Sequence, residues 1–208
     1  MLDIQDFFTA CVGNWKTDRT YHYPLQNEVE RSYTEFTVAA LELADKRQIS
    51  SAFLPVGWMS DESAIDRSPG FSISFNTVSE KDERVSMQLK ALFVDERSIT
   101  APHLIPTDPL APAIPLAAEI LDSSEVIKGL YLRDEGYSET GAITGRFTYL
   151  PSRQALELTT YYSRSVAVDS LRLIDLNTRL RTIVTYQRPQ PGEVPTVINL
   201  VGFGLERK

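Results

Sequence analysis

A period of two runs through residues 15–23, which read Trp-Lys-Thr-Asp-Arg-Thr-Tyr-His-Tyr. Such alternation is typical of a β-strand, because successive side chains point to opposite faces. One face of this strand then carries Trp15, Thr17, Arg19, Tyr21 and Tyr23. From the residues alone, the guanidinium of Arg19 either lies at the rim of an aromatic core or binds an anion inside, and the rim is favoured.

Residues 3–11, in front of this strand, predict a short helix. Its apolar residues recur at helical spacing and form one face, made of Ile4, Phe7, Phe8 and Cys11. Asp3 is suited to cap the N-terminus of this helix. Because Cys11 lies on the apolar face, it is interpreted as a packing residue rather than a nucleophile.

Short alternating segments continue through the rest of the chain. A proline-rich stretch at residues 98–121, with a short helix expected at 116–121, interrupts them, because proline cannot donate to a strand ladder. About ten short strands and one helix that can plug an end favour an all-β antiparallel barrel over a sandwich. The whole chain, residues 1–208, is expected to form this single domain. The other strands are predicted at residues 31–38, within 47–58, and at 71–75, 85–94, 126–133, 142–150, 156–164, 171–174, 179–188 and 196–206.

The formal net charge of −7 over 208 residues argues against nucleic-acid binding, which needs a basic surface. It also argues against an anionic membrane surface, and no segment approaches the roughly 20 apolar residues that span a bilayer. A single cysteine permits no internal disulfide, and the N-terminus has no signal-peptide pattern. The sequence is therefore interpreted as that of a cytoplasmic protein.

Few residues are suited to metal or nucleophilic chemistry. The two histidines, His22 and His103, and the single cysteine have no zinc-ligand spacing. The sequence contains neither the Gly-x-Ser-x-Gly turn of hydrolases nor a phosphate-binding glycine loop. No metal site and no cofactor are expected.

A second group of charged and aromatic residues reads Arg-Asp-Glu-Gly-Tyr-Ser-Glu at residues 133–139 and Gly-Arg-Phe at residues 145–147. It is either a solvated hairpin with weak surface ion pairs or a carboxylate and an arginine presented to a charged ligand, and spacing alone favours the hairpin. Trp58 and Tyr161 are either core residues or flat surfaces for a planar ligand. Because Tyr161 and Tyr162 are adjacent, one is expected to face inward and the other outward.

An ordered set of motifs resembles the S/U-type (CpcS/CpeS) phycobiliprotein lyases over nearly the whole chain. The set begins with Phe-Phe at residues 7–8, Gly-x-Trp at 13–15 and Arg-Thr-x-His at 19–22. Each motif alone is weak, and lipocalins in general share the Gly-x-Trp, but the order of the set is more specific. The set continues with the two segments at 133–139 and 145–147, Leu-Glu-Leu-Thr-Thr-Tyr-Tyr at 156–162, Asn-Thr-Arg-Leu-Arg-Thr at 177–182 and Leu-Glu-Arg at 205–207.

The resemblance implies a calycin-like or lipocalin-like barrel of ten antiparallel strands closed by a helix. It implies that the protein binds a linear tetrapyrrole, a bilin such as phycocyanobilin or phycoerythrobilin, without a covalent bond. The bilin is then transferred to a cysteine of a phycobiliprotein, where a thioether forms. Arginines are suited to the two propionates of a bilin, a buried carboxylate to its protonated ring nitrogens, and aromatic residues to its conjugated face. No metal or nucleotide is implied, and the bilin is a substrate.

Carried over to this sequence, the resemblance assigns Arg19 and Arg146 to propionate or ring contacts. It assigns Glu139 to the carboxylate that faces the pyrrole nitrogens, so that Glu139 and Arg146 are the candidate catalytic residues. Trp58 and Tyr161 become candidate walls of the bilin site. His22 matches the histidine of the family, although on a regular strand it faces away from Arg19.

The same resemblance makes Trp15 a structural plug at the closed end of the barrel, covered by Arg181 or Arg207. Residues 167–172 depart from the family pattern. Where many members carry Ser-x-Glu-Arg-x-Trp, this chain reads Ala-Val-Asp-Ser-Leu-Arg, so that Asp169 replaces the glutamate. Two alternatives therefore stay open: a non-catalytic partner subunit of a heteromeric lyase, and a lipocalin-like carrier of a hydrophobic small molecule.

The partners implied by the resemblance are a bilin and an apo-phycobiliprotein subunit. A homodimer and a heterodimer with a related lyase subunit are both left open. The implied location is the cyanobacterial cytoplasm or the plastid stroma.

Overall fold

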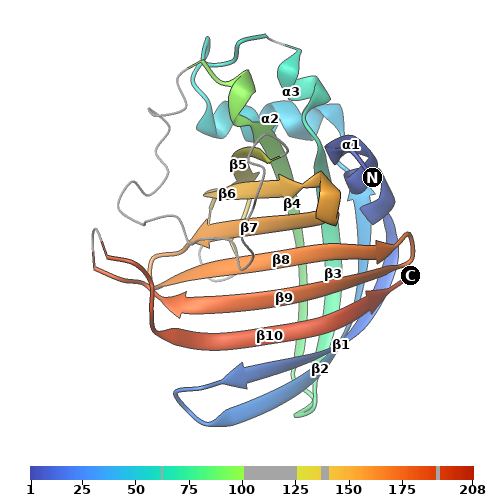
Figure 1. Ribbon diagram of the computed structural model, residues 1–208, viewed down its shortest axis with the longest axis vertical. Helices are drawn as coiled ribbons and strands as arrows, with labels where there is room; N and C mark the ends of the chain where they lie inside the picture. The colour runs from blue at the N-terminus through green and yellow to red at the C-terminus, as the bar shows by residue number, and fades with distance from the viewer. Residues whose placement is uncertain (62, 101–125, 137–140, 191–192) are drawn as a thin grey trace.

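The computed structural model describes residues 1–61, 63–100, 126–136, 141–190 and 193–208, and within them ten antiparallel strands close into a barrel (Figure 1). The expected all-β barrel with a short N-terminal helix is therefore confirmed. Its order is β1-β10-β9-β8-β7-β6-β5-β4-β3-β2, so that pairing of the first strand with the last completes the barrel. The strands are β1 (Gly13–Tyr23), β2 (Glu28–Ala40), β3 (Gly70–Ser79), β4 (Arg84–Asp95), β5 (Ile127–Arg133), β6 (Ile143–Leu150), β7 (Ala155–Tyr161), β8 (Ser165–Asp175), β9 (Thr178–Gln187) and β10 (Ile198–Arg207).

The predicted N-terminal helix is α1 (Ile4–Cys11), which packs its apolar face into one end of the barrel. Asp3 caps it as expected, because its side chain accepts a hydrogen bond of 2.8 Å from the backbone N–H of Asp6. Phe8 is buried against Phe93 of β4, with ring centroids 4.5 Å apart. The closed half of the barrel is filled by Phe7, Phe8, Cys11, Trp15, Phe36, Val38, Ile73, Leu89, Ala91, Phe93, Tyr131, Phe147, Tyr149, Leu156, Leu158, Leu171 and Leu173.

The strand predicted within residues 47–58 is wrong, because the chain forms helix α2 (Leu43–Phe53) there. Residues 43–53 contain neither proline nor glycine, and buried Ile49 and half-buried Phe53 lie four residues apart, on one helical face. Figure 1 shows α2 beside the short helix α3 (Ala64–Arg67), at one end of the molecule. The two helices contribute to a second core, made of Leu41, Ile49, Leu54, Ile65, Leu92, Val94, Ile99, Leu130 and Leu132.

Two short 3-10 turns complete the described elements, η1 (Glu96–Ser98) and η4 (Pro151–Arg153). The helix expected at residues 116–121 lies outside the described residues.

The pairing of β1 decides which of its side chains enter the barrel. β1 pairs with β2 over its whole length without a register shift. Trp15 and Thr17 are buried while Lys16 and Asp18 are exposed, so the alternation read from the sequence is retained. Arg19 therefore faces the interior, and His22 faces the outside.

Candidate functional site

Among the described residues, four arginines and two carboxylates lie well inside the barrel, where side chains are at most 14% exposed. Strand registers place them on the inner face; for example, Thr17 is opposite Glu206, and Glu206 is opposite Arg179. Buried charges are costly unless they are paired or hydrogen-bonded, so such a group is more typical of a binding site than of a core. The six residues are Arg19 of β1, Arg133 of β5, Asp169 of β8, Arg179 and Arg181 of β9, and Glu206 of β10.

Glu206 holds two of these arginines at once. Its Oε1 accepts a hydrogen bond of 3.1 Å from Nη2 of Arg19, and its Oε2 accepts one from Nε of Arg179. Burial alone raises the pKa of this carboxyl group, but Arg179, Arg181 and Arg19 outweigh burial and hold the pKa below its ordinary value. Glu206 is therefore ionised at neutral pH and fixes both guanidinium groups.

Arg179 also covers the closed end of the barrel. Its guanidinium carbon lies 4.5 Å from the ring centroid of Trp15 and 5.3 Å from that of Phe36. The indole Nε1 of Trp15 donates a hydrogen bond of 2.8 Å to the carbonyl of Cys11, which ties β1 to the end of α1. Trp15 thus lies at the closed end, as expected for a structural plug.

The prediction that Arg181 or Arg207 covers Trp15 is wrong. Arg181 pairs with Asp169 instead, and Arg207 is exposed on the outer face. Besides Arg179, the cation over Trp15 is Lys208, whose Nζ lies 5.0 Å from the ring centroid. The alternation of β9 explains the difference, because Arg179 lies one inward position nearer the closed end than Arg181.

Asp169 and Arg181 form the second ion pair of the interior. Oδ1 of Asp169 accepts hydrogen bonds from Nη2 at 3.0 Å and from Nε at 3.3 Å. Among the described residues, no hydrogen bond reaches the other carboxylate oxygen, Oδ2. Asp169 can therefore offer a charged acceptor to a ligand in the barrel.

Arg133 is the fourth inward arginine, at the end of β5. Its Nη1 donates a hydrogen bond of 3.0 Å to the hydroxyl of Tyr162, and its guanidinium carbon lies 5.9 Å from the ring centroid of Tyr131. Tyr162 is buried and Tyr161 is half-buried. Of the adjacent tyrosines, Tyr162 therefore faces inward, in phase with Leu156 and Leu158 of β7.

A cavity of about 40 Å³ remains beside α1, with Arg179 and Arg181 at its polar side and Phe8 and Cys11 at its apolar side. A site for a small organic ligand is usually about 300–1,000 Å³, so this cavity alone is too small for one. Toward the other end of the barrel, several inner-face side chains are only half-buried, namely Tyr21, Phe75, Met87 and Ile183. This more open part of the interior, called the wider half below, lies on the side of Arg19 and Arg181 away from the closed end.

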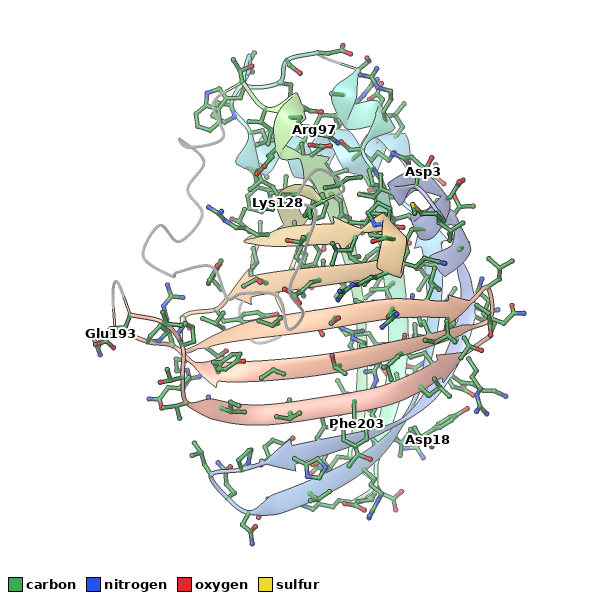
Figure 2. All side chains as sticks on the ribbon, in the orientation of Figure 1. Asp3, Asp18, Arg97, Lys128, Glu193 and Phe203 are labelled. Carbon is green, nitrogen blue, oxygen red and sulfur yellow. The ribbon has the colours of Figure 1, made fainter. Side chains whose placement is uncertain are left out.

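Of the predicted site residues, Arg19 is in this interior, whereas His22, Arg146 and Tyr161 are on the outer face. His22 stacks on Phe203, with ring centroids 5.8 Å apart, and Phe203 projects from the outside of the barrel in Figure 2. Arg146 turns outward because its neighbour Phe147 fills the core and is only 2% exposed. The outward direction of His22 agrees with the strand alternation, whereas Arg146 and Tyr161 do not contribute to the interior as propionate contact and wall. Any role of the three side chains in bilin binding stays a prediction.

Trp58 lies elsewhere, packed against the second core, so it does not line the barrel interior either. Its indole is half-buried among aliphatic side chains there. Glu139, the predicted pyrrole-facing carboxylate, lies outside the described residues, as does His103.

The segment that departs from the family pattern divides between the two faces of β8. Asp169 and Leu171 point inward, so the carboxylate that replaces glutamate remains available to the interior. Ser170 and Arg172 alternate with them and point outward. The departures at residues 170 and 172 therefore alter the outer surface and leave the charged interior unchanged.

Sequence reasoning missed most of the interior charges. Arg179 and Arg181 share a strand face, as do Gly204 and Glu206 on β10, and this period of two is visible in the sequence. Two arginines on one face are typical of a solvent-exposed face, however, and only the register with Glu206 shows that they point inward.

Among the residues that the structure describes, no helix has the length and apolar character needed to cross a bilayer. The same part of the chain brings together no group of three or more His, Cys, Asp or Glu side chains suited to a metal ion. The expectation that no metal or cofactor is required stays a prediction.

A closed antiparallel barrel with a helix packed into one end and charged side chains in its interior defines a calycin-like, ligand-binding class of protein. The chain belongs to the CpeS-like protein family, whose model matches residues 3–102 and 114–208.

The relatives cover nearly the whole chain. It is 37% identical over 204 residues to chromophore lyase CpcS/CpeS 1 of Synechococcus sp. (strain JA-3-3Ab), a match that spans 97% of this chain and 94% of that protein. It is 25% identical over 183 residues to chromophore lyase CpcS/CpeS of Thermosynechococcus vestitus, with 88% and 84% covered. The solved structure of the S-type phycobiliprotein lyase CPES from Guillardia theta has a TM-score of 0.68 and 14% identity over 100% of this chain and 93% of that one, and it supports the fold.

Proposed function

We propose that this protein is a bilin lyase, which binds a linear tetrapyrrole inside the barrel and transfers it to a cysteine of a phycobiliprotein. Membership of the CpeS-like family and the names of the relatives support this class of activity. The observation that carries the proposal is the buried part of the interior, where, among the described side chains that are at most 14% exposed, arginines outnumber carboxylates by four to two. Such an interior is suited to a ligand with two carboxylates.

The wider half of the barrel suits the rest of a bilin. Its half-buried aromatic and aliphatic side chains, among them Tyr21 and Ile183, offer apolar contact to a long conjugated face. Asp169 is the carboxylate that we assign to the pyrrole nitrogens, because its Oδ2 is open to a donor from a ligand. A carboxylate beside these nitrogens favours their protonated form, which makes the bilin a better electrophile.

In the transfer step, the thiol of the acceptor cysteine adds across the exocyclic ethylidene double bond of a terminal ring. The C–S bond forms at the ethylidene carbon, and the proton of the thiol ends on the adjacent ring carbon, so no oxidant or reductant is needed. The lyase contributes by fixing the orientation of the bilin and by excluding wrong attachment sites. The two partners are thus a bilin and an apo-phycobiliprotein, in the cyanobacterial cytoplasm or the plastid stroma.

The carrier alternative predicts an aliphatic pocket with Arg146 in solvent. Arg146 is indeed on the outer face, but the interior contains ion pairs that a fatty-acid pocket does not require. The partner-subunit alternative agrees with the altered outer positions Ser170 and Arg172, since these change a surface rather than the bilin site.

One assay distinguishes these functions. The protein is titrated with phycocyanobilin and, separately, phycoerythrobilin, and an apo-phycobiliprotein is then added. A lyase gives a red-shifted, enhanced absorption band, followed by covalent pigment on the acceptor in a denaturing gel. No spectral change contradicts bilin binding, and displacement of the bilin by a fatty acid at similar concentration favours a carrier. Binding without transfer, with transfer restored by a related lyase subunit, favours the partner subunit.

A further inference from the structure

Arg19 of β1 and Ser32 of β2 lie directly opposite each other on the inner face of the barrel. Directly opposed side chains on one face of an antiparallel pair have Cβ atoms about 4.5–5.5 Å apart, so the two can contact one ligand group. Ser32 is 6% exposed and the side chain of Arg19 is 13% exposed. The registers place Arg19 level with Gly204 and Arg181, one inward position farther from the closed end than Glu206.

Each of these side chains has a buried polar atom without a hydrogen-bond partner among the described residues, namely Nε of Arg19 and Oγ of Ser32. Two polar groups beside them have partners. Nη2 of Arg19 donates to Glu206, and the hydroxyl of Thr34, two positions from Ser32, bonds with that of Thr77 at 2.8 Å. Buried donors are nearly always paired, so two adjacent exceptions indicate a place for an acceptor that comes from outside the chain.

The surroundings hold Arg19 in one position. Glu206 binds one end of its guanidinium group, whose carbon lies 5.8 Å from the ring centroid of Phe36. Its aliphatic part runs over Gly204, where an added Cβ would come within 3.1 Å of Cγ. The Nε–H donor is therefore fixed before any ligand arrives, which is the arrangement expected of a preorganised site.

We propose that Arg19 Nε and Ser32 Oγ form a carboxylate subsite, which takes one propionate of the bilin, and that Ser32 determines specificity for a free acid. The proposal rests on the function proposed above. Both atoms can donate, and a carboxylate has two oxygens that accept charge-assisted hydrogen bonds. An esterified propionate has no such charge and gains little from the pair.

The test measures binding of phycocyanobilin and of its dimethyl ester to four forms of the full-length protein. Wild type binds the free acid more tightly than the ester. Ser32→Ala weakens binding of the free acid by about tenfold and leaves ester binding unchanged, because a hydrogen bond to a charged group is lost only with the acid. Arg19→Lys keeps the charge but removes the Nε–H. This variant is also expected to lose the preference for the free acid over the ester.

Thr34→Val is the matched control, because the Thr34 hydroxyl already has its partner in Thr77, and it binds both ligands as the wild type does. Thermal unfolding of each variant shows whether it is folded. If folded Ser32→Ala binds the acid as tightly as wild type does, the two atoms hold only water and the subsite is wrong. If wild type binds neither ligand, the proposed function itself fails.

Discussion

Asp169 and Arg181 form an ion pair inside the barrel, in which one carboxylate oxygen receives both contacts, at 3.0 and 3.3 Å. The other oxygen receives no hydrogen bond from the described residues. The two carboxylate oxygens of Asp169 can therefore have different roles. One oxygen orients an arginine, and the other can meet the protonated nitrogens of a ligand.

Asp169→Asn is expected to bind bilin but to lose the red-shifted band of the protonated chromophore at neutral pH. The amide keeps an acceptor but no charge, so the pKa of the bound bilin falls. Covalent transfer falls by about tenfold or more, since the bilin is a weaker electrophile. Absorption spectra across a pH series measure the shift, and Asp169→Glu serves as the charged control. An unchanged spectrum in the Asn variant, with loss in Glu139→Gln, would return the role to Glu139.

Glu206→Gln is expected to cost about 3–5 kcal/mol of unfolding free energy at pH 7, because two inward arginines lose a fully buried charged partner. The pKa of Glu206 in the folded protein lies below its ordinary value of 4.5. Its contribution to stability is therefore fully present above that value and is lost as the pH falls through the folded pKa.

Chemical denaturation at pH 7 and at pH 4 measures both effects. Wild type loses part of this contribution between the two, and the Gln variant shows a smaller acid loss. Glu28→Gln, at an exposed position of β2, is the control and changes stability by about 0.5 kcal/mol or less. Equal effects of the two substitutions would contradict the buried network.

Cys11 is expected to stay unmodified even with bilin in the barrel. Burial raises the pKa of this thiol, although Arg179 opposes the shift, so little of it is the reactive thiolate. Alkylation by iodoacetamide at pH 8 is predicted to be about tenfold slower, or more, in the folded protein than in denaturant. A coloured band on the lyase itself in a denaturing gel, lost in Cys11→Ser, would show that the thiol does capture bilin.

The sequence was sufficient for the barrel because a closed sheet needs one apolar and one polar face, and that alternation is local. The phase of residues 15–23 predicted correctly that His22 faces away from Arg19. The same reasoning misassigned residues 47–58, where a helix covers the outer face of the sheet. The missed pattern in the sequence was the helical spacing of Ile49 and Phe53, which lie four residues apart on the inward face of the helix.

The interior was harder to predict because it depends on pairing between distant strands. Glu206 meets Arg19 and Arg179 only through the registers of β10 with β1 and β9. For Arg146, the resemblance to the family predicted a functional arginine, but it did not show to which face of β6 the side chain points. Its outward direction follows from Phe147, which takes the buried position beside it.

The central claim is that the interior arginines, rather than those outside the barrel, bind the chromophore. The most direct measurement compares bilin affinities of Arg181→Gln and Arg146→Gln, a matched pair with one inward and one outward arginine. We predict about tenfold or greater weakening for Arg181→Gln, because a charge-assisted contact to a carboxylate is lost. We predict less than about threefold change for Arg146→Gln, as for an exposed charge. If Arg146→Gln abolishes binding while folded Arg181→Gln binds normally, the interior site is wrong.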